Sequence, residues 1–139
     1  MNEFIFRNEE TRINDPVNSP TTAFVIVENQ NGYMLLYNKY YNRWEITGGY
    51  IEPGESPIET AIRECKEESN QNIVEIKFFG IAKYSKMNAA IFYTYLSEEE
   101  AFIENEEIKE LKWWKFGESI TESVDSESIK LIELYRSKQ

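Results

Sequence analysis

The 139-residue sequence predicts an α/β fold in which a mixed β-sheet lies between helices, as an α/β/α sandwich. Apolar, β-branched segments separated by turn residues recur along the chain, and helical periodicity appears at its centre and at its C-terminal end. The composition, 41% hydrophobic and 29% charged, is ordinary for a globular protein, and the length fits one domain over residues 1–139.

The strand predictions rest on local pattern. Residues 1–20 are polar and contain Pro16 and Pro20, so an extended N-terminal arm or edge segment is expected. Asn31-Gly32 favours a tight hairpin turn. The predicted strands share β-branched or aromatic residues bounded by turn residues: 21–28, 33–37, 73–84, 89–96 and 110–116. Two polar segments, 40–54 and 97–107, predict loops.

The central helix has a clear start. Ser56 is a suitable N-cap, Pro57 suits the first helical position, and Glu59 completes a capping box. Asn70 is expected to end the helix, because Asn tolerates the left-handed conformation of a C-terminal cap. The predicted apolar stripe is Ile58, Ala61, Ile62 and Cys65.

A second helix is predicted over 126–138, with Ile129, Ile132 and Tyr135 on its apolar side.

The composition excludes several kinds of chemistry. There is no histidine and one cysteine, Cys65, which excludes a Ser-His-Asp or Cys-His triad, an intrachain disulfide and a Cys/His zinc site. The net charge of −10 argues against duplex nucleic acid as a partner. Neither a membrane-length apolar run nor a secretory signal is visible, so a cytoplasmic setting without membrane attachment is expected. The oligomeric state is left open.

Three carboxylates gather on the polar side of the central helix. Glu64 precedes Glu67 and Glu68 by three and four residues, which places all three on adjacent turns. Such like-charge pairs cost about 0.2–0.5 kcal/mol each in an isolated helix. A divalent cation would offset this repulsion, and hard oxygen ligands suit Mg²⁺ or Mn²⁺.

A glycine-rich loop leads directly into this helix. It contains Gly48, Gly49 and Gly54, and its carbonyls and the helix N-terminus suit a metal and a phosphate group. Arg63 is spaced to pair with Glu59 and Glu67 and to reach back to Glu55. Loop, arginine and carboxylates together indicate a platform for a metal ion and a diphosphate.

Residues 49–68 resemble the Nudix box, the signature of hydrolases that act on nucleoside diphosphates linked to another group. The matching positions are Gly49, Glu55, Arg63, Glu64, Glu67 and Glu68. Four positions differ from the usual pattern: Cys65 replaces an aliphatic residue, Asn70 a glycine, Gln71 an apolar residue, and Thr47 a proline. None of these differences removes a carboxylate.

The resemblance implies a Nudix-like fold and a set of site residues. Metal binding is expected at Glu64, Glu67, Glu68 and the carbonyl of Gly48. The catalytic set is Glu64, Arg63 and Glu107, with Arg63 also bracing the loop through Glu55 and with Gly49 in the phosphate loop. The general base is either Glu64 or a later glutamate, and three candidates occupy the later loop: Glu104, Glu106 and Glu107, of which Glu107 is favoured.

The implied reaction is Mg²⁺- or Mn²⁺-dependent attack of water on a diphosphate of a small, nucleotide-like substrate. A nucleoside triphosphate, including an oxidised one, suits the short chain, and Tyr37, Tyr40, Tyr41 and Trp44 include candidates for base stacking. Three alternatives stay open: a catalytically silent nucleotide-binding module, an acidic interaction domain, and a hydrolase acting on capped RNA.

Overall fold

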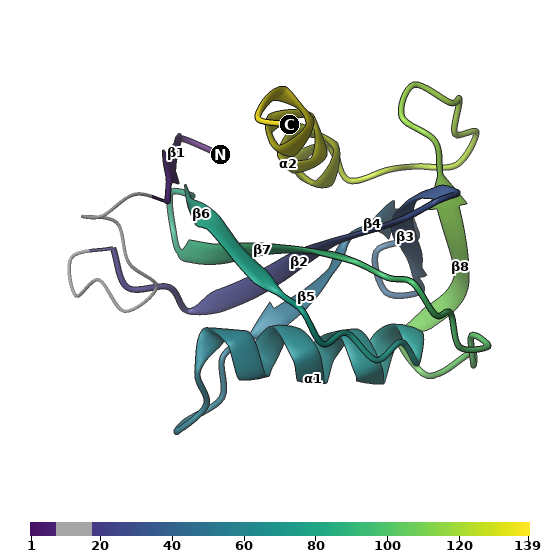
Figure 1. The fold of residues 1–139 in the computed structure, drawn as a ribbon, viewed down its shortest axis with the longest axis horizontal. Coiled ribbons are helices and arrows are strands. Elements are labelled where there is room, and N and C mark those ends of the chain that lie inside the picture. The colour runs from purple at the N-terminus through teal and green to yellow at the C-terminus, as the bar shows by residue number, and fades with distance from the viewer. Residues whose placement is uncertain (8–17) are drawn as a thin grey trace.

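The computed structural model describes residues 1–7 and 18–139 and contains one mixed sheet of eight strands with a helix on each face (Figure 1). Helix α1 (Pro57–Ser69) lies against one face, and α2 (Ser126–Ser137) lies against the other. The predicted α/β/α sandwich is therefore confirmed.

The central strand pair of the sheet is parallel. Strands β2 and β7 run parallel to each other, whereas the other paired strands run antiparallel. Across the sheet the order is β1, β6, β7, β2, β3, β4, with β5 paired to β2 and β8 paired to β3. The strands are β1 (Glu3–Phe6), β2 (Thr22–Asn29), β3 (Gly32–Asn38), β4 (Arg43–Glu45), β5 (Thr47–Tyr50), β6 (Lys77–Lys83), β7 (Asn88–Tyr95) and β8 (Ile108–Trp114).

Three predicted bounds were wrong in part, one of them β8, which spans Ile108–Trp114 where 110–116 was expected. The segment 40–54 was expected to be a loop, yet it contains β4 and β5. Strand β5 has the sequence Thr-Gly-Gly-Tyr, which has little strand propensity, and it forms because it pairs with the buried strand β2. Residues 73–76 were expected to begin a strand, but pairing starts at Lys77. The predicted N-terminal arm is an edge strand at 3–6, and residues 8–17 of it lie outside the described residues.

Helix α1 begins and ends as its sequence predicts. The Ser56 Oγ accepts a hydrogen bond from the Glu59 N–H at 3.2 Å, and the Glu59 carboxylate accepts one from the Ser56 N–H at 2.8 Å. Asn70 ends the helix with a φ of 63°.

The buried face of α1 differs from the predicted stripe. Ala61 and Cys65 are fully buried, but Ile58 and Ile62 remain 38% and 37% exposed. Thr60, Glu68 and Ser69 are buried instead. The helix thus turns small and polar residues towards the sheet, where Gly49 of β5 lies close to Glu64 and Thr47 of β5 bonds Glu68.

Two hydrophobic cores fill the spaces between the layers. The core under α1 includes Ala61 and Cys65, and the core under α2 includes Leu131, Ile132 and Tyr135. Adjacent Trp113 and Trp114 point to opposite cores, as neighbours on a strand do. Within the described part of the chain, neither helix has the length and hydropathy needed to cross a membrane.

Candidate active site

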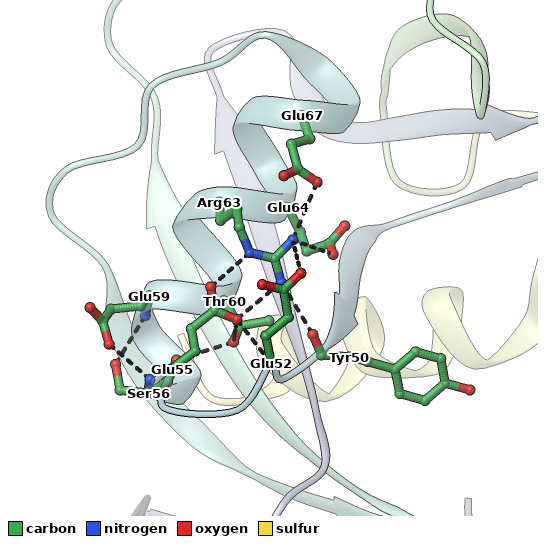
Figure 2. A network of polar contacts seen from close by, with 9 residues as sticks. All are labelled: Tyr50, Glu52, Glu55, Ser56, Glu59, Thr60, Arg63, Glu64 and Glu67. Carbon is green, nitrogen blue, oxygen red and sulfur yellow. Dashed lines mark hydrogen bonds and ion pairs between the residues drawn. The ribbon is translucent and has the colours of Figure 1, made fainter.

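Arg63 connects the glycine-rich loop to helix α1 (Figure 2). Its Nε and Nη2 donate to the two carboxylate oxygens of Glu55 at 2.7 and 3.0 Å, and Nη2 also donates to the carbonyl of Tyr50 at 3.2 Å. Thr60 adds a further donor to Glu55 at 2.6 Å. The Arg63 guanidinium and the Thr60 hydroxyl lower the pKa of Glu55 to about 2. The loop is therefore fixed to the helix by a bidentate ion pair.

The same guanidinium also contacts two carboxylates of the box. Its Nη1 lies 2.9 Å from Glu64 and 3.3 Å from Glu67 (Figure 2). The expected contact with Glu59 is absent from the ion pairs of the described residues, because Glu59 is held by the capping box.

Glu68 is the most buried of the box carboxylates, at 7% exposure. One of its oxygens accepts hydrogen bonds from the Thr47 hydroxyl and from the Gly48 N–H. Burial raises the pKa of Glu68, and the facing carboxyl of Glu107 raises it further. Burial also raises the pKa of Glu64 above its ordinary value. Negative charge at both positions therefore lacks full compensation from the protein.

Two glycines allow β5 to approach its neighbours. A Cβ on Gly49 would lie 2.5 Å from the carboxyl carbon of Glu64, and a Cβ on Gly48 would lie 2.4 Å from the Ala23 carbonyl oxygen. Any side chain at Gly49 would displace the Glu64 carboxylate. The glycine pair is therefore required by close packing.

The later loop contributes one carboxylate to the site. Glu107 is half-buried and faces Glu68, whereas Glu104 forms an ion pair with Lys39 at 2.8 Å and Glu106 is exposed. Of the three candidates in this loop, the structure brings Glu107 to the box.

The donor set fits a hard divalent cation. It consists of carboxylate oxygens, two of them on groups whose pKa is raised, and these gain most from a nearby cation. In the arrangement described for 1–7 and 18–139, no three acidic or cysteine side chains already converge as a metal-binding group. Arg63 holds Glu64 and Glu67, and Thr47 holds Glu68, so these side chains must turn to share an ion.

A cleft of about 190 Å³ adjoins the two glycines. Its walls combine Phe24, Tyr41 and Met87 with the charged side chains of Arg43 and Glu45. The Arg43 guanidinium lies 3.1 Å from Glu45 and 4.9 Å from the centre of the Tyr41 ring. The cleft also receives Asp125 and Ser128 from the start of α2.

Of the four aromatic residues considered for stacking, only Tyr41 lines this cleft, and it is 66% exposed. Tyr37 and Trp44 instead pack against each other with ring centres 5.4 Å apart.

Several of these residues carried no sequence signal. Arg43 and Glu45 lie in a segment expected to be a loop, and Thr47 was noted only as a departure from the box. Asp125 was detectable as an N-cap, because it precedes the second predicted helix and its carboxylate accepts a hydrogen bond from the Ser128 N–H. Its approach to the cleft depends on the tertiary fold.

The chain resembles several known proteins. It is 33% identical over 94 residues to a putative 8-oxo-dGTP diphosphatase of Bacillus subtilis, covering 66% of this chain and 63% of the relative. The match thus spans less than two thirds of that relative's length.

Solved structures share the fold at low sequence identity. The Bacillus subtilis pyrophosphohydrolase BsRppH is 20% identical, with a TM-score of 0.72 over 98% of this chain and 89% of that one. The NUDIX domain of Shewanella oneidensis NrtR, solved with ADP ribose, is 16% identical, with a TM-score of 0.71 over 89% and 92%. The family model of the NUDIX domain matches residues 18–135, which is most of the chain. The chain therefore belongs to the NUDIX domain family.

Proposed function

We propose that this chain is a Mg²⁺- or Mn²⁺-dependent pyrophosphohydrolase of nucleoside triphosphates, including oxidised ones. The observation that carries the proposal is that Glu107 lies close enough to Glu68 and Glu64 to raise their pKa values. Gly48 and Gly49, which precede these box carboxylates, line a cleft that would suit a base. The 8-oxo-dGTP diphosphatase name of the relative supports this substrate class.

The carboxylates Glu64, Glu67 and Glu68, with the carbonyl of Gly48, would hold the metal. Bound there, a divalent cation supplies charge neutralisation at the phosphate oxygens and orients the attacking water. Arg63 keeps Glu64 and Glu67 on the same side of α1 as the loop, through contacts at 2.9 and 3.3 Å.

Glu107 is assigned as the general base, with Glu64 as the other candidate. A base must accept the proton of the water as it attacks phosphorus in line with the departing phosphate. Glu107 lies on a different segment from the three box carboxylates and faces Glu68. From this position it would act on a water at the edge of the metal site. Arg63 is already bonded to Glu64, which leaves that carboxylate less free to accept a proton.

The cleft is assigned to the base of the nucleotide. At about 190 Å³ it is smaller than the roughly 300–1,000 Å³ typical of sites for whole drug-sized ligands, so it suits one fragment of a substrate. Tyr41 offers a stacking surface, while Arg43 and Glu45 offer a donor and an acceptor. The triphosphate would extend from the cleft across Gly48 and Gly49 to the carboxylates.

The test is release of phosphate or pyrophosphate from a panel of nucleoside di- and triphosphates, 8-oxo-dGTP, dinucleotides and nucleotide sugars, with Mg²⁺ and with Mn²⁺. Metal-dependent turnover that is lost in both Glu67→Gln and Glu68→Gln would support the proposal. Saturable nucleotide binding without turnover would favour the catalytically silent module. Failure to bind either nucleotide or metal would favour an interaction domain.

A further inference from the structure

The end of helix α1 carries two departures from the Nudix box, Asn70 and Gln71, and both hold the acidic loop (residues 97–107). Asn70 has a left-handed backbone conformation, and its Nδ2 donates to the carbonyl of Ala101 at 2.8 Å. Gly at this position would satisfy the backbone but would have no side chain to make this bond.

Gln71 makes a two-way contact with the same loop. Its side chain is fully buried, its Nε2 donates to the Glu100 carbonyl at 2.7 Å, and its Oε1 accepts from the Glu100 N–H at 2.8 Å. The second hydrogen of Nε2 is used by the Ser69 carbonyl at 3.1 Å. An apolar residue would fill the space, but it would leave the Glu100 backbone without these partners. Ile73, which is buried, supplies the apolar packing at the helix exit.

Asn105 completes the attachment from the loop side. Its Nδ2 donates to the Glu68 carbonyl at 3.1 Å, and its Oδ1 accepts from the backbone N–H groups of Glu107 at 3.1 Å and Ile108 at 2.9 Å. One side chain therefore joins the backbone of the buried box glutamate to the backbone of the candidate base.

Lys39 holds the same segment from the opposite side. Its N–H donates to the Glu107 carbonyl at 2.8 Å, and its Nζ donates to the Asn105 carbonyl at 2.6 Å. The next residue, Ile108, is buried in the core. The backbone of Glu107 is thus fixed on both sides, and little freedom remains except in its side chain.

Charge attraction explains the attachment of this loop to Lys39, which pairs with Glu104 at 2.8 Å, but not its attachment to α1. The acidic loop contains six glutamates and no lysine or arginine, and it packs against the end of α1 that carries Glu67 and Glu68. Like charges at this distance repel. Neutral amides can hold two acidic segments together, because they satisfy backbone groups without adding charge.

We propose that Asn70, Gln71 and Asn105 form an amide clamp that positions Glu107 against Glu68, with Asn105 as its main member. The inference rests on the proposed function, because it assigns these residues a role through Glu107. They do not touch substrate, so they are positioning residues. The two departures from the box are then part of how this chain sets its base.

The first experiment is a double-mutant cycle on kcat, with Asn105→Ala and Glu107→Gln alone and combined. Asn105→Ala should lower kcat about 10-fold or more, while the KM for nucleotide and the Mn²⁺ affinity measured by electron paramagnetic resonance stay within about twofold. In the Glu107→Gln background, Asn105→Ala should change kcat less than about twofold. The proposal would be overturned if the fold losses in kcat of the two single variants multiplied in the double variant. It would also be overturned if Glu107→Gln were as active as wild type.

Gln71→Leu provides a second test without a cavity, because Leu is close to Gln in volume. Like Asn105→Ala, it should lower kcat in the wild-type background. In the Glu107→Gln background it should leave kcat nearly unchanged. Asn72→Ala is the matched control, since Asn72 is exposed beside the clamp and should leave kcat unchanged.

The second experiment is hydrogen–deuterium exchange, which does not depend on turnover. Asn105→Ala should speed exchange at the amides of Glu107 and Ile108, while the amides of α1 stay as protected as in wild type. In the Asn72→Ala control, the amides of Glu107 and Ile108 should exchange as slowly as in wild type. Unchanged exchange at 107 and 108 would overturn the clamp. If wild type turned over no substrate, the proposed function would fail, and the exchange result alone would decide whether the clamp exists.

Discussion

The two ends of helix α1 treat the same side chain, glutamate, in opposite ways. At the first end, Glu55 is paired with the Arg63 guanidinium, and its pKa falls to about 2. At the other end, Glu68 is buried among neutral donors and faces Glu107, and its pKa rises. Where Arg63 forms a bidentate pair with Glu55, the carboxylate has a structural role. Where the protein supplies only amides and a hydroxyl, the negative charge stays available to a cation from solution.

The largest effect is expected from replacing Arg63, whose guanidinium pairs with Glu55. Arg63→Met should lower kcat/KM more than about 100-fold, because Glu64 and Glu67 lose the contact that orients them. It should also reduce the free energy of unfolding by about 2 kcal/mol, since hydrogen bonds to Glu55 and to the Tyr50 carbonyl are lost. Kinetics and urea denaturation measure both quantities. Arg63→Lys should rescue little, because an ammonium cannot form the bidentate pair; full rescue would show that only the charge matters.

Thr47→Val tests the neutral donors at the second end. Loss of the hydroxyl that bonds Glu68 should lower Mn²⁺ affinity or kcat by about 10–100-fold, as is usual for groups that orient a metal ligand. Thr47→Ser, which keeps the hydroxyl, should retain most of the activity. Isothermal titration with Mn²⁺ and steady-state kinetics provide the measurements. Equal activity of the Val and Ser variants would show that Thr47 serves packing alone.

The pH dependence of stability should have opposite signs at the two ends. The folded pKa of Glu55 lies below the ordinary value of 4.5, so its contribution is present above that pH and is lost as pH falls towards 2. The folded pKa of Glu68 lies above 4.5, so its ionisation disfavours the fold as pH rises past that value.

In EDTA at pH 7, Glu68→Gln should therefore be more stable than wild type by about 1 kcal/mol or more, and Glu55→Gln should be less stable. The Glu68→Gln gain should vanish below pH 4.5, and the Glu55→Gln loss should vanish near pH 2. Urea denaturation at a series of pH values gives these curves. A destabilised Glu68→Gln at pH 7 would contradict the comparison.

The smallest effect is expected at Asn70. Asn70→Gly keeps the left-handed cap but loses the bond to Ala101, so the free energy of unfolding should change by less than about 0.5 kcal/mol. Thermal denaturation measures this change, and Asn70→Ala, which is disfavoured at a φ of 63°, should be clearly less stable than Asn70→Gly. Similar stability of the two variants would mean that the backbone conformation at this cap matters little.

Local signals predicted the parts of the fold that short segments determine. The capping box at Ser56, the Asn70 cap and most strands are confirmed, because hydrogen bonds within a few residues and side-chain alternation fix them. Strand β5 was missed, because its glycines are selected by the close approach to Ala23 and Glu64 and carry no strand preference of their own. Ile58 and Ile62 misled the prediction of the buried face, because the packing surface under α1 admits small residues.

The sequence by itself determined the spacing of the box and its carboxylates, since one helix places Glu64, Glu67 and Glu68 on one side whatever surrounds it. Only the tertiary structure decided that Glu68 is buried among neutral donors and that Glu107 faces it. Arg63 lies on the same helix, and its spacing predicted the contacts with Glu55 and Glu67. Thr47 comes from β5 and Glu107 from the acidic loop, so the burial of Glu68 and the charge that faces it depend on what folding brings within a few ångströms. No pattern along the chain carries that information, because desolvation and charge interaction act through space.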